Sequence, residues 1–429
     1  MTSELRPVPG DDGPVAVRGG VGGIRFQWEE LEEAATALSL LAADAGDVAV
    51  ALGYIERDVS EYPWRIMHLQ PHGGVAGPYY QGARAHLEGA WTAALESGRA
   101  LTGTEQRLRA SLQAYRLADG VAQAATDAAR FGSEATAQAI GRTAISQGAV
   151  TLGPITLQEK VRGSAVAFDG SVEAVLGRLA VVDDAVPGTF EVLRGGTEDV
   201  PVYVVVLPGT RMRAVNRGPG SNPFDPGGVV EAITEDSRYV EAAVLDALER
   251  SGAARGDAMI IAGYSQGGLH AVNLAASQGL AERYDVQLVL TAGAPTGWST
   301  SGAAEYLHLE HRADAIPALD TVPNVDDRHR TTVTLGNPVP ALGYRADGSR
   351  EPWGLGPAHK LENYVEGARL IDASEAPSLV PAAALLAAAG VSGTARRHSF
   401  TAVRHPEPIG VRGTAGAHRT QRRGTRLGQ

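Results

Sequence analysis

The pattern of apolar residues changes abruptly near residue 150, and this change constrains the fold of the 429-residue chain more than any other feature. Before it, apolar residues recur at alternating intervals of three and four, which places them on one face of a helix. After it, short runs rich in Val and Ile alternate with helical patterns, as in a sheet whose strands are joined by helices. We therefore expect an all-α region followed by an α/β region.

The all-α region contains two matched apolar seams. One covers residues 31–55, and the other has apolar residues seven apart over 87–115. A stretch broken by Pro and Gly, residues 61–80, separates them, so the sequence predicts an antiparallel helical hairpin. An Ala-rich segment at 120–148 is a candidate for a third helix, which would complete a small bundle.

The α/β region shows short elements in regular alternation. One strand, within VPVYVVVLPG, is apolar at every position, which is typical of a strand buried on both faces. The expected strands are 189–194, 200–207, 258–263, 286–292, 306–311 and 331–335, and the expected helices are 237–250, 266–277 and one that begins near Leu361.

Composition excludes several classes of protein. A net charge of −11 argues against a nucleic-acid binder, since phosphate contacts need clustered Lys and Arg. The chain has no cysteine, so a disulfide framework, a Cys-based zinc site and an iron–sulfur cluster are impossible. Lys160 and Lys360 are the only lysines, and this preference for Arg, with the heavy use of Ala and Gly, is typical of a GC-rich genome such as an actinobacterial one.

Both ends of the chain are expected to be disordered. Residues 1–25 are rich in Gly, Pro and Asp and hold no apolar run, so we do not expect them to be a secretory signal peptide. Residues 376–429 are predicted to form an Ala-rich helix and a basic disordered tail, because eight Arg oppose one acid from Arg396 onward. Binding of this tail to an acidic surface is the alternative. The most apolar run, 379–391, is shorter than the ~20 residues that span a bilayer, which predicts a soluble protein without a transmembrane segment.

The strongest motif is G-x-S-x-G, which spans Gly263 to Gly267 between an apolar strand and an amphipathic helix. This is the setting of a nucleophile elbow, a sharp turn on which a serine is exposed to substrate. Glycines two residues to either side remove collisions with neighbouring elements. The following helix directs its positive end toward the place where an oxyanion would form. Ser265 is therefore predicted to be a catalytic nucleophile, and a structural turn is the alternative.

From about residue 155 to 372 the chain resembles the α/β-hydrolase fold, nearest to its lipase, esterase and cutinase-like branches. The resemblance implies a catalytic domain at 151–375, with a mostly parallel sheet and helices on both faces. It also implies a catalytic triad in the chain order Ser, then Asp or Glu, then His.

Asp314 and His359 satisfy that order. Asp314 follows the strand at 306–311 in a D-x-x-P segment, and His359 lies in a Gly/Pro-rich loop just before a helix. Asp320 is the alternative acid. His329 precedes its strand instead of following it, so it suits the role of the base less well.

The resemblance also assigns an oxyanion hole. One donor is the backbone N–H of Gln266, the residue after the nucleophile, and the other is Thr210, in the loop after the buried strand. Lipases often carry His-Gly in this loop, whereas this chain has Pro208-Gly209, which leaves the second donor open.

Three further residues are candidates for contacts with substrate. Tyr264, inside the elbow, is expected to shape the acyl pocket. Arg211 and Phe224 lie in the Gly/Pro-rich loop beside the site and are expected to line the entrance or a lid, with a plain surface loop as the alternative. His308 and His311, together with Asp314, resemble a metal cluster, but residues three apart on a strand point to opposite faces, so the two histidines suit a chelate poorly and no metal site is expected.

These residues together predict acyl transfer. His359 would accept the proton of Ser265, and Asp314 would orient and stabilise the imidazolium. The expected reaction is hydrolysis of a small-molecule or lipid carboxylic ester, with no cofactor. The alternatives within the same chemistry are a thioesterase, an amidase and an acyltransferase.

Residues 26–150 show a second resemblance, to the WXG-type, ESAT-like helical hairpins that type VII secretion exports. Those hairpins carry Y-x-x-x-D/E near the end of the second helix, and Tyr115 and Asp119 match it. The W-x-G turn is not intact, because the residue two positions after Trp64 is Ile66 and not glycine. The resemblance implies export without a conventional signal peptide, with the secretion machinery or a helical hairpin as partner; the cytoplasm is the alternative location. It also implies an alternative function, a secreted interaction or effector protein whose hydrolase domain is weakly active or inactive.

Overall fold

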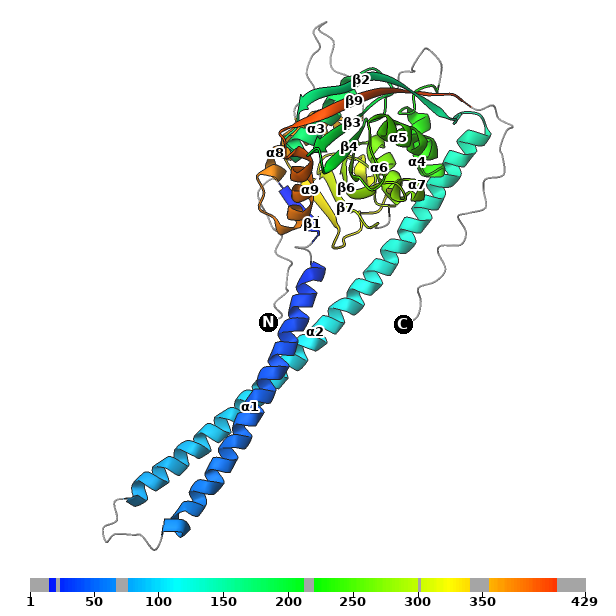
Figure 1. Ribbon diagram of the computed structural model, residues 1–429. Coiled ribbons are helices and arrows are strands. Elements are labelled where there is room, and N and C mark those ends of the chain that lie inside the picture. The colour runs from blue at the N-terminus through cyan, green and yellow to red at the C-terminus, as the bar shows by residue number, and fades with distance from the viewer. Residues whose placement is uncertain are drawn as a thin grey trace. The chain divides into compact units, whose positions relative to one another are not determined.

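The computed structural model describes residues 15–20, 24–66, 76–211, 220–299, 302–339 and 355–406 (Figure 1). The chain divides into two compact units. One comprises Ile24–Ala125, and the other comprises Met1–Gly23 together with Thr126–Gln429. An N-terminal helical region and a mixed α/β region are thus both present, as the change of pattern near residue 150 predicts.

The helical unit consists of α1 (Ile24–Ile66) and the first part of α2 (Ala76–Ser146). The prediction of a third helix at 120–148 is wrong, because this segment continues α2, a single helix of 71 residues. Alanine has the highest helix propensity, and an isolated glycine lowers helix stability by only about 1 kcal/mol, so nothing in the segment ends the helix. Both helices also extend into the stretch expected to be a loop. The side chains of Trp64, Tyr115 and Asp119 lie outside the described residues.

The helices of this unit leave many large apolar side chains exposed. Leu40, Tyr54 and Tyr79 have 64%, 62% and 76% of their surface exposed. The segment Leu31–Pro63 of α1 is long and apolar enough to cross a membrane by length and composition. A helix that packs against others can have the same composition. The absence of a transmembrane segment therefore stays a prediction.

The second unit is built on a sheet with nine described strands in the order β1-β8-β7-β6-β5-β4-β3-β9-β2. Its centre is parallel and follows chain order, as expected, and consists of β4 (Pro201–Leu207), β5 (Ala258–Tyr264), β6 (Asp285–Ala292), β7 (Glu305–His311) and β8 (Arg330–Leu335). The outer pairings are antiparallel and involve β1 (Val15–Gly19), β2 (Ile155–Ala167), β3 (Thr189–Gly196) and β9 (Thr394–Arg404).

Helices cover both faces of this sheet. One apolar cluster receives side chains from α3 (Val172–Asp184), α8 (Leu361–Asp372) and α9 (Val380–Gly390). The other receives them from α5 (Arg238–Arg250) and α6 (Gln266–Ala276), near which lie α4 (Pro226–Thr234) and α7 (Gln278–Ala281).

Strand β4 contributes to both clusters. Val204 and Val206 belong to the first, and Val205 and Leu207 belong to the second. Successive side chains of a strand point to opposite faces, so a strand with helices on both sides needs apolar residues throughout. This explains the unbroken apolar run in the sequence.

Two segments that the sequence predicted to be disordered are strands. Val15–Gly19 forms β1, which pairs with β8, and β9 lies between β3 and β2 (Figure 1). The prediction of a disordered tail rested on the arginines of β9 and overlooked the alternation of apolar and charged side chains along the strand. Phe400 and Ala402 lie in the apolar core, whereas Arg397 lies 3.6 Å from Glu191. The sheet therefore extends beyond the expected boundary at residue 375 to Arg404. Residues 407–429 lie outside the described part of the chain.

Candidate active site

Ser265 occupies the sharp turn between β5 and α6. Its φ of 51° and ψ of −117° are uncommon for a residue that carries a side chain. The two motif glycines make the turn possible. A Cβ on Gly263 would lie 2.2 Å from the carbonyl of Gly267, and a Cβ on Gly267 would lie 2.4 Å from the Leu207 oxygen. The local geometry is that of the elbow predicted from the sequence.

The side chains of Ser265, His359 and Asp314 come together at this turn. His359 Nε2 lies 2.9 Å from Ser265 Oγ, and His359 Nδ1 lies 2.7 Å from Asp314 Oδ2. The histidine ends a short 3₁₀ turn, Pro357–His359, and the aspartate follows β7. Each of the three residues is at most 8% exposed. The structure thus joins the three residues in the order Ser–His–Asp.

Three donors hold the carboxylate of Asp314. Besides His359, the hydroxyl of Tyr364 donates to Oδ2 at 2.6 Å and the N–H of Ile316 donates to Oδ1 at 2.9 Å. Burial raises the pKa of Asp314, but the hydrogen bonds from His359, Tyr364 and Ile316 outweigh it, and the pKa lies below its usual value. Asp314 is therefore an ionised acceptor for His359. Sequence reasoning missed Tyr364, which lies on α8 and belongs to no short motif.

Asp320, the alternative acid, serves a different purpose. Its Oδ2 accepts the N–H of Gly297 at 2.6 Å, and its Oδ1 accepts the N–H of Val322 at 3.3 Å. Burial raises the pKa of Asp320 to about 6. The carboxylate ties the loop after β6 to the segment after β7, and the structure brings Asp314 to the histidine instead.

The two predicted oxyanion donors follow neighbouring parallel strands. Leu207, at the end of β4, pairs with Gly263 of β5, so the loop with Thr210 and the elbow with Gln266 leave the same edge of the sheet. Gln266 is the first residue of α6, where a backbone N–H has no partner within the helix. The loop of Thr210 is anchored on α3, because the N–H of the preceding Gly209 donates to Asp183 Oδ1 at 3.0 Å.

The three predicted substrate residues differ in their surroundings, and for Tyr264 and Arg211 contact with substrate stays a prediction. The Tyr264 ring stacks on His359 with 5.2 Å between centroids, and its hydroxyl donates to the His359 carbonyl, which supports the histidine. The Arg211 guanidinium lies 3.7 Å from Asp183 Oδ2. Phe224 is 1% exposed inside the apolar core, so the prediction that it lines an entrance is wrong. Its neighbours in sequence are polar, which concealed its burial.

The two histidines that resembled a metal pair have separate partners. His308 Nδ1 lies 2.8 Å from Thr291 Oγ1, and His311 Nε2 lies 2.9 Å from the Asn337 oxygen. Over the described residues, no group of three or more His, Asp or Glu is arranged to hold a metal ion.

Comparison with known proteins assigns the chain to no family. No family model matches it, and neither does any curated protein or any solved structure. What the site can do chemically therefore follows from its own geometry.

Proposed function

We propose that this protein is a serine hydrolase of the α/β-hydrolase type that cleaves carboxylic esters. The observation that carries the proposal is the continuous chain of contacts from Ser265 Oγ through both ring nitrogens of His359 to Asp314 Oδ2. The strained backbone of Ser265 supports it, because such conformations concentrate at functional sites.

Each step of the proposed acyl transfer is assigned to a residue of this site. His359 Nε2 takes the proton of Ser265 Oγ as that oxygen attacks the ester carbonyl, and Asp314 stabilises the imidazolium. The backbone N–H groups of Gln266 and Thr210 would receive the oxyanion. His359 then returns the proton to the leaving alcohol, and an acyl group remains on Ser265. Water, deprotonated by the same histidine, releases the acid and restores the serine.

The substrate class that this chemistry accepts is a small-molecule or lipid ester. Thioesters and amides have the same acyl carbon, and an alcohol in place of water would make the reaction an acyl transfer. All of these reactions require Ser265. The experiments therefore test the role of Ser265 first and the preference for esters, thioesters or amides afterwards.

The decisive experiment is labelling with a fluorophosphonate, together with hydrolysis of nitrophenyl esters of graded chain length. We expect the wild type to react and Ser265→Ala to lose both the label and, by roughly 10⁴–10⁶-fold, kcat. A folded wild-type protein that takes no label and cleaves no ester would overturn the proposal.

A matched pair of carboxylates tests the triad separately. Asp314→Asn removes the charge that orients His359 and should lower kcat by about 10⁴-fold. Asp320→Asn changes a buried aspartate six positions away that contacts backbone N–H groups, and it should leave kcat near the wild-type value. The reverse order of effects would contradict the assignment of Asp314.

A further inference from the structure

A second buried polar network reaches the nucleophile turn from the face of the sheet covered by α5 and α6. At its centre is the carbonyl oxygen of Pro223. This oxygen accepts a hydrogen bond from Gln266 Nε2 at 3.2 Å and another from Arg404 Nη2 at 3.3 Å. Gln266 directly follows Ser265, and Arg404 is the last residue of β9. The end of the last described strand is thereby linked to the elbow.

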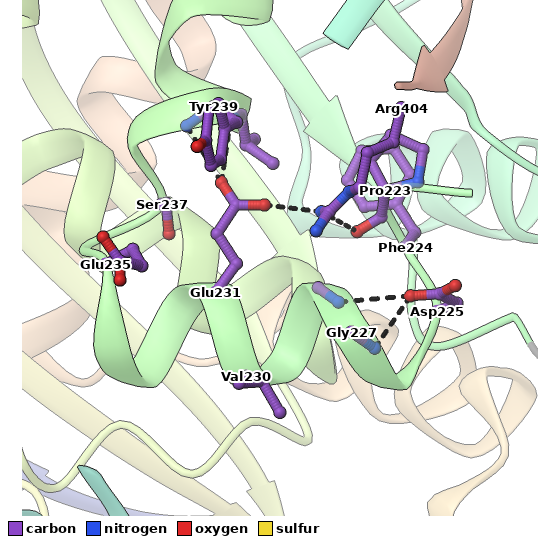
Figure 2. Close-up of polar contacts among 12 residues, drawn as sticks. Pro223, Phe224, Asp225, Gly227, Val230, Glu231, Glu235, Ser237, Tyr239 and Arg404 are labelled. Atoms are coloured by element: carbon purple, nitrogen blue, oxygen red, sulfur yellow. Dashed lines mark hydrogen bonds and ion pairs between the residues drawn. The ribbon is translucent and has the colours of Figure 1, made fainter. Parts of the chain in front are cut away.

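A buried ion pair anchors this network. Arg404 Nη2 lies 2.5 Å from Glu231 Oε2, and the two side chains are 1% and 0% exposed. The other oxygen of Glu231 accepts the N–H groups of Tyr239 and Val240, each at 3.0 Å (Figure 2). Such pairs add little net stability, because desolvation offsets their attraction, but their hydrogen bonds define one geometry. Arg404 is therefore held in a fixed place against α4 and the start of α5.

The residues on either side of Pro223 contact the loop that carries the second predicted oxyanion donor. The carbonyl of Phe224 accepts the N–H of Arg211 at 2.6 Å, and Asn222 Nδ2 donates to the Arg211 carbonyl at 2.9 Å. Arg211 directly follows Thr210, the second predicted oxyanion donor. Residues 222–224 thus contact both the side chain of Gln266 and the neighbour of Thr210.

The side chain of Gln266 is closely enclosed. Its Nε2 lies 3.3 Å from His270 Nε2, and the other ring nitrogen of His270 lies 2.8 Å from Ser237 Oγ. Burial, together with the charge of Arg404, lowers the pKa of His270 to about 3, so the ring is neutral and able to accept from Gln266. A Cβ on Gly228 would lie 2.0 Å from Gln266 Nε2. Only glycine leaves room for this contact.

We propose that residues 222–224, held by the Arg404–Glu231 pair, position the oxyanion hole. Arg404 and the side chain of Gln266 are positioning residues: they set the backbone N–H groups of Gln266 and Thr210 relative to Ser265 and do not touch the substrate. This inference rests on the proposed hydrolase function. Donors that are already in place need no reorganisation during the reaction, and a displacement of about 1 Å can lower the rate ~10²-fold.

The test compares Arg404→Met with Arg178→Met. Each substitution removes an arginine from an ion pair with a buried glutamate. Arg178 lies on α3, is 13% exposed and pairs at 2.5 Å with Glu191 instead of residues 222–224, and Arg397 remains 3.6 Å from that carboxylate in the variant. We expect Arg404→Met to lower kcat by roughly 10–100-fold with little change in KM, and Arg404→Lys to recover part of the loss. We expect Arg178→Met to keep the wild-type kcat.

Gln266→Leu provides a variant that keeps the ion pair, in case loss of Arg404 prevents folding. It removes the hydrogen bond to Pro223 and should lower kcat by a similar factor. Affinity for an alkyl boronic acid, which forms a tetrahedral adduct with serine, should fall in parallel with kcat, whereas loss of packing alone would leave it unchanged.

The outcomes separate the two proposals. If the wild type neither labels nor cleaves esters, the hydrolase function fails. If the wild type is active while Gln266→Leu and folded Arg404→Met keep both wild-type kcat and boronate affinity, the hydrolase function stands and the positioning proposal is overturned.

Discussion

Two histidines belong to the contact networks around the Ser265 turn, one through Ser265 itself and one through Gln266, and their surroundings differ. His359 contacts the serine on one side and the carboxylate of Asp314 on the other. His270, on the first turns of α6, contacts an uncharged amide and an uncharged hydroxyl, and burial lowers its pKa to about 3. A place beside the Ser265 turn is therefore not enough for the proposed role of base, which also needs a carboxylate to stabilise the imidazolium.

The two regions also differ in what they hold in place. Around His359, the Tyr264 ring and the Asp314 carboxylate orient one imidazole, and the Tyr364 hydroxyl donates to that carboxylate. Around His270, the contacts converge on the Gln266 side chain and the Pro223 carbonyl. In the proposed reaction, the first region moves a proton and the second holds the backbone in place.

The largest expected difference between the regions is in activity. His359→Gln should lower kcat by about 10⁴–10⁶-fold, because no base remains to accept the serine proton. His270→Gln should lower it by no more than about tenfold, since glutamine can replace the hydrogen bonds that hold Gln266. Steady-state hydrolysis of a nitrophenyl ester measures kcat of both variants. Comparable losses of kcat would contradict the different roles given to the two histidines.

A smaller effect is expected at Tyr364. Tyr364→Phe removes the hydroxyl that donates to Asp314 at 2.6 Å, and a hydrogen bond to a charged group contributes roughly 1.5–3 kcal/mol. The pKa of Asp314 should rise and kcat should fall by roughly 10–100-fold, which steady-state ester hydrolysis measures. Tyr284→Phe, in the opposite apolar cluster, is the control. A wild-type kcat in Tyr364→Phe would show that the hydroxyl does not support the proposed triad.

A final effect concerns the free energy of unfolding instead of the reaction rate. The pKa of His270 is about 3 in the folded protein, below the ordinary value of 6.5, so as pH falls the unfolded chain takes up the proton first. The stability from this group is complete above pH 6.5 and is lost toward pH 3, by about 1.4 kcal/mol per pH unit. His270→Gln should remove this slope. Urea unfolding of both proteins at pH 7, 6 and 5 measures it, and parallel slopes would contradict the neutral, buried state of His270.

Much of the candidate triad could be predicted because its signals are local. The elbow is defined by five adjacent residues, and Asp314 follows a recognisable strand. The prediction failed where a segment of polar composition is buried. Phe224 lies in a polar, Gly-rich segment but its side chain is in the core, and β9 carries arginines but pairs with β3 and β2 inside the sheet. The composition of a segment does not show which of its side chains are buried, because in a strand successive side chains point to opposite faces.

The sequence by itself determined the two helices of the hairpin, the parallel centre of the sheet and the elbow at Ser265, because periodicity and turn chemistry act between residues a few positions apart. Only the tertiary structure decided which carboxylate contacts His359 and that the Tyr364 hydroxyl donates to this carboxylate. It also decided that Arg404 and the side chain of Gln266 donate to the same carbonyl beside the Ser265 turn. Arg404 and Glu231 are 173 positions apart. A contact of that separation leaves no local pattern, because it exists only after the strands have been ordered in the sheet.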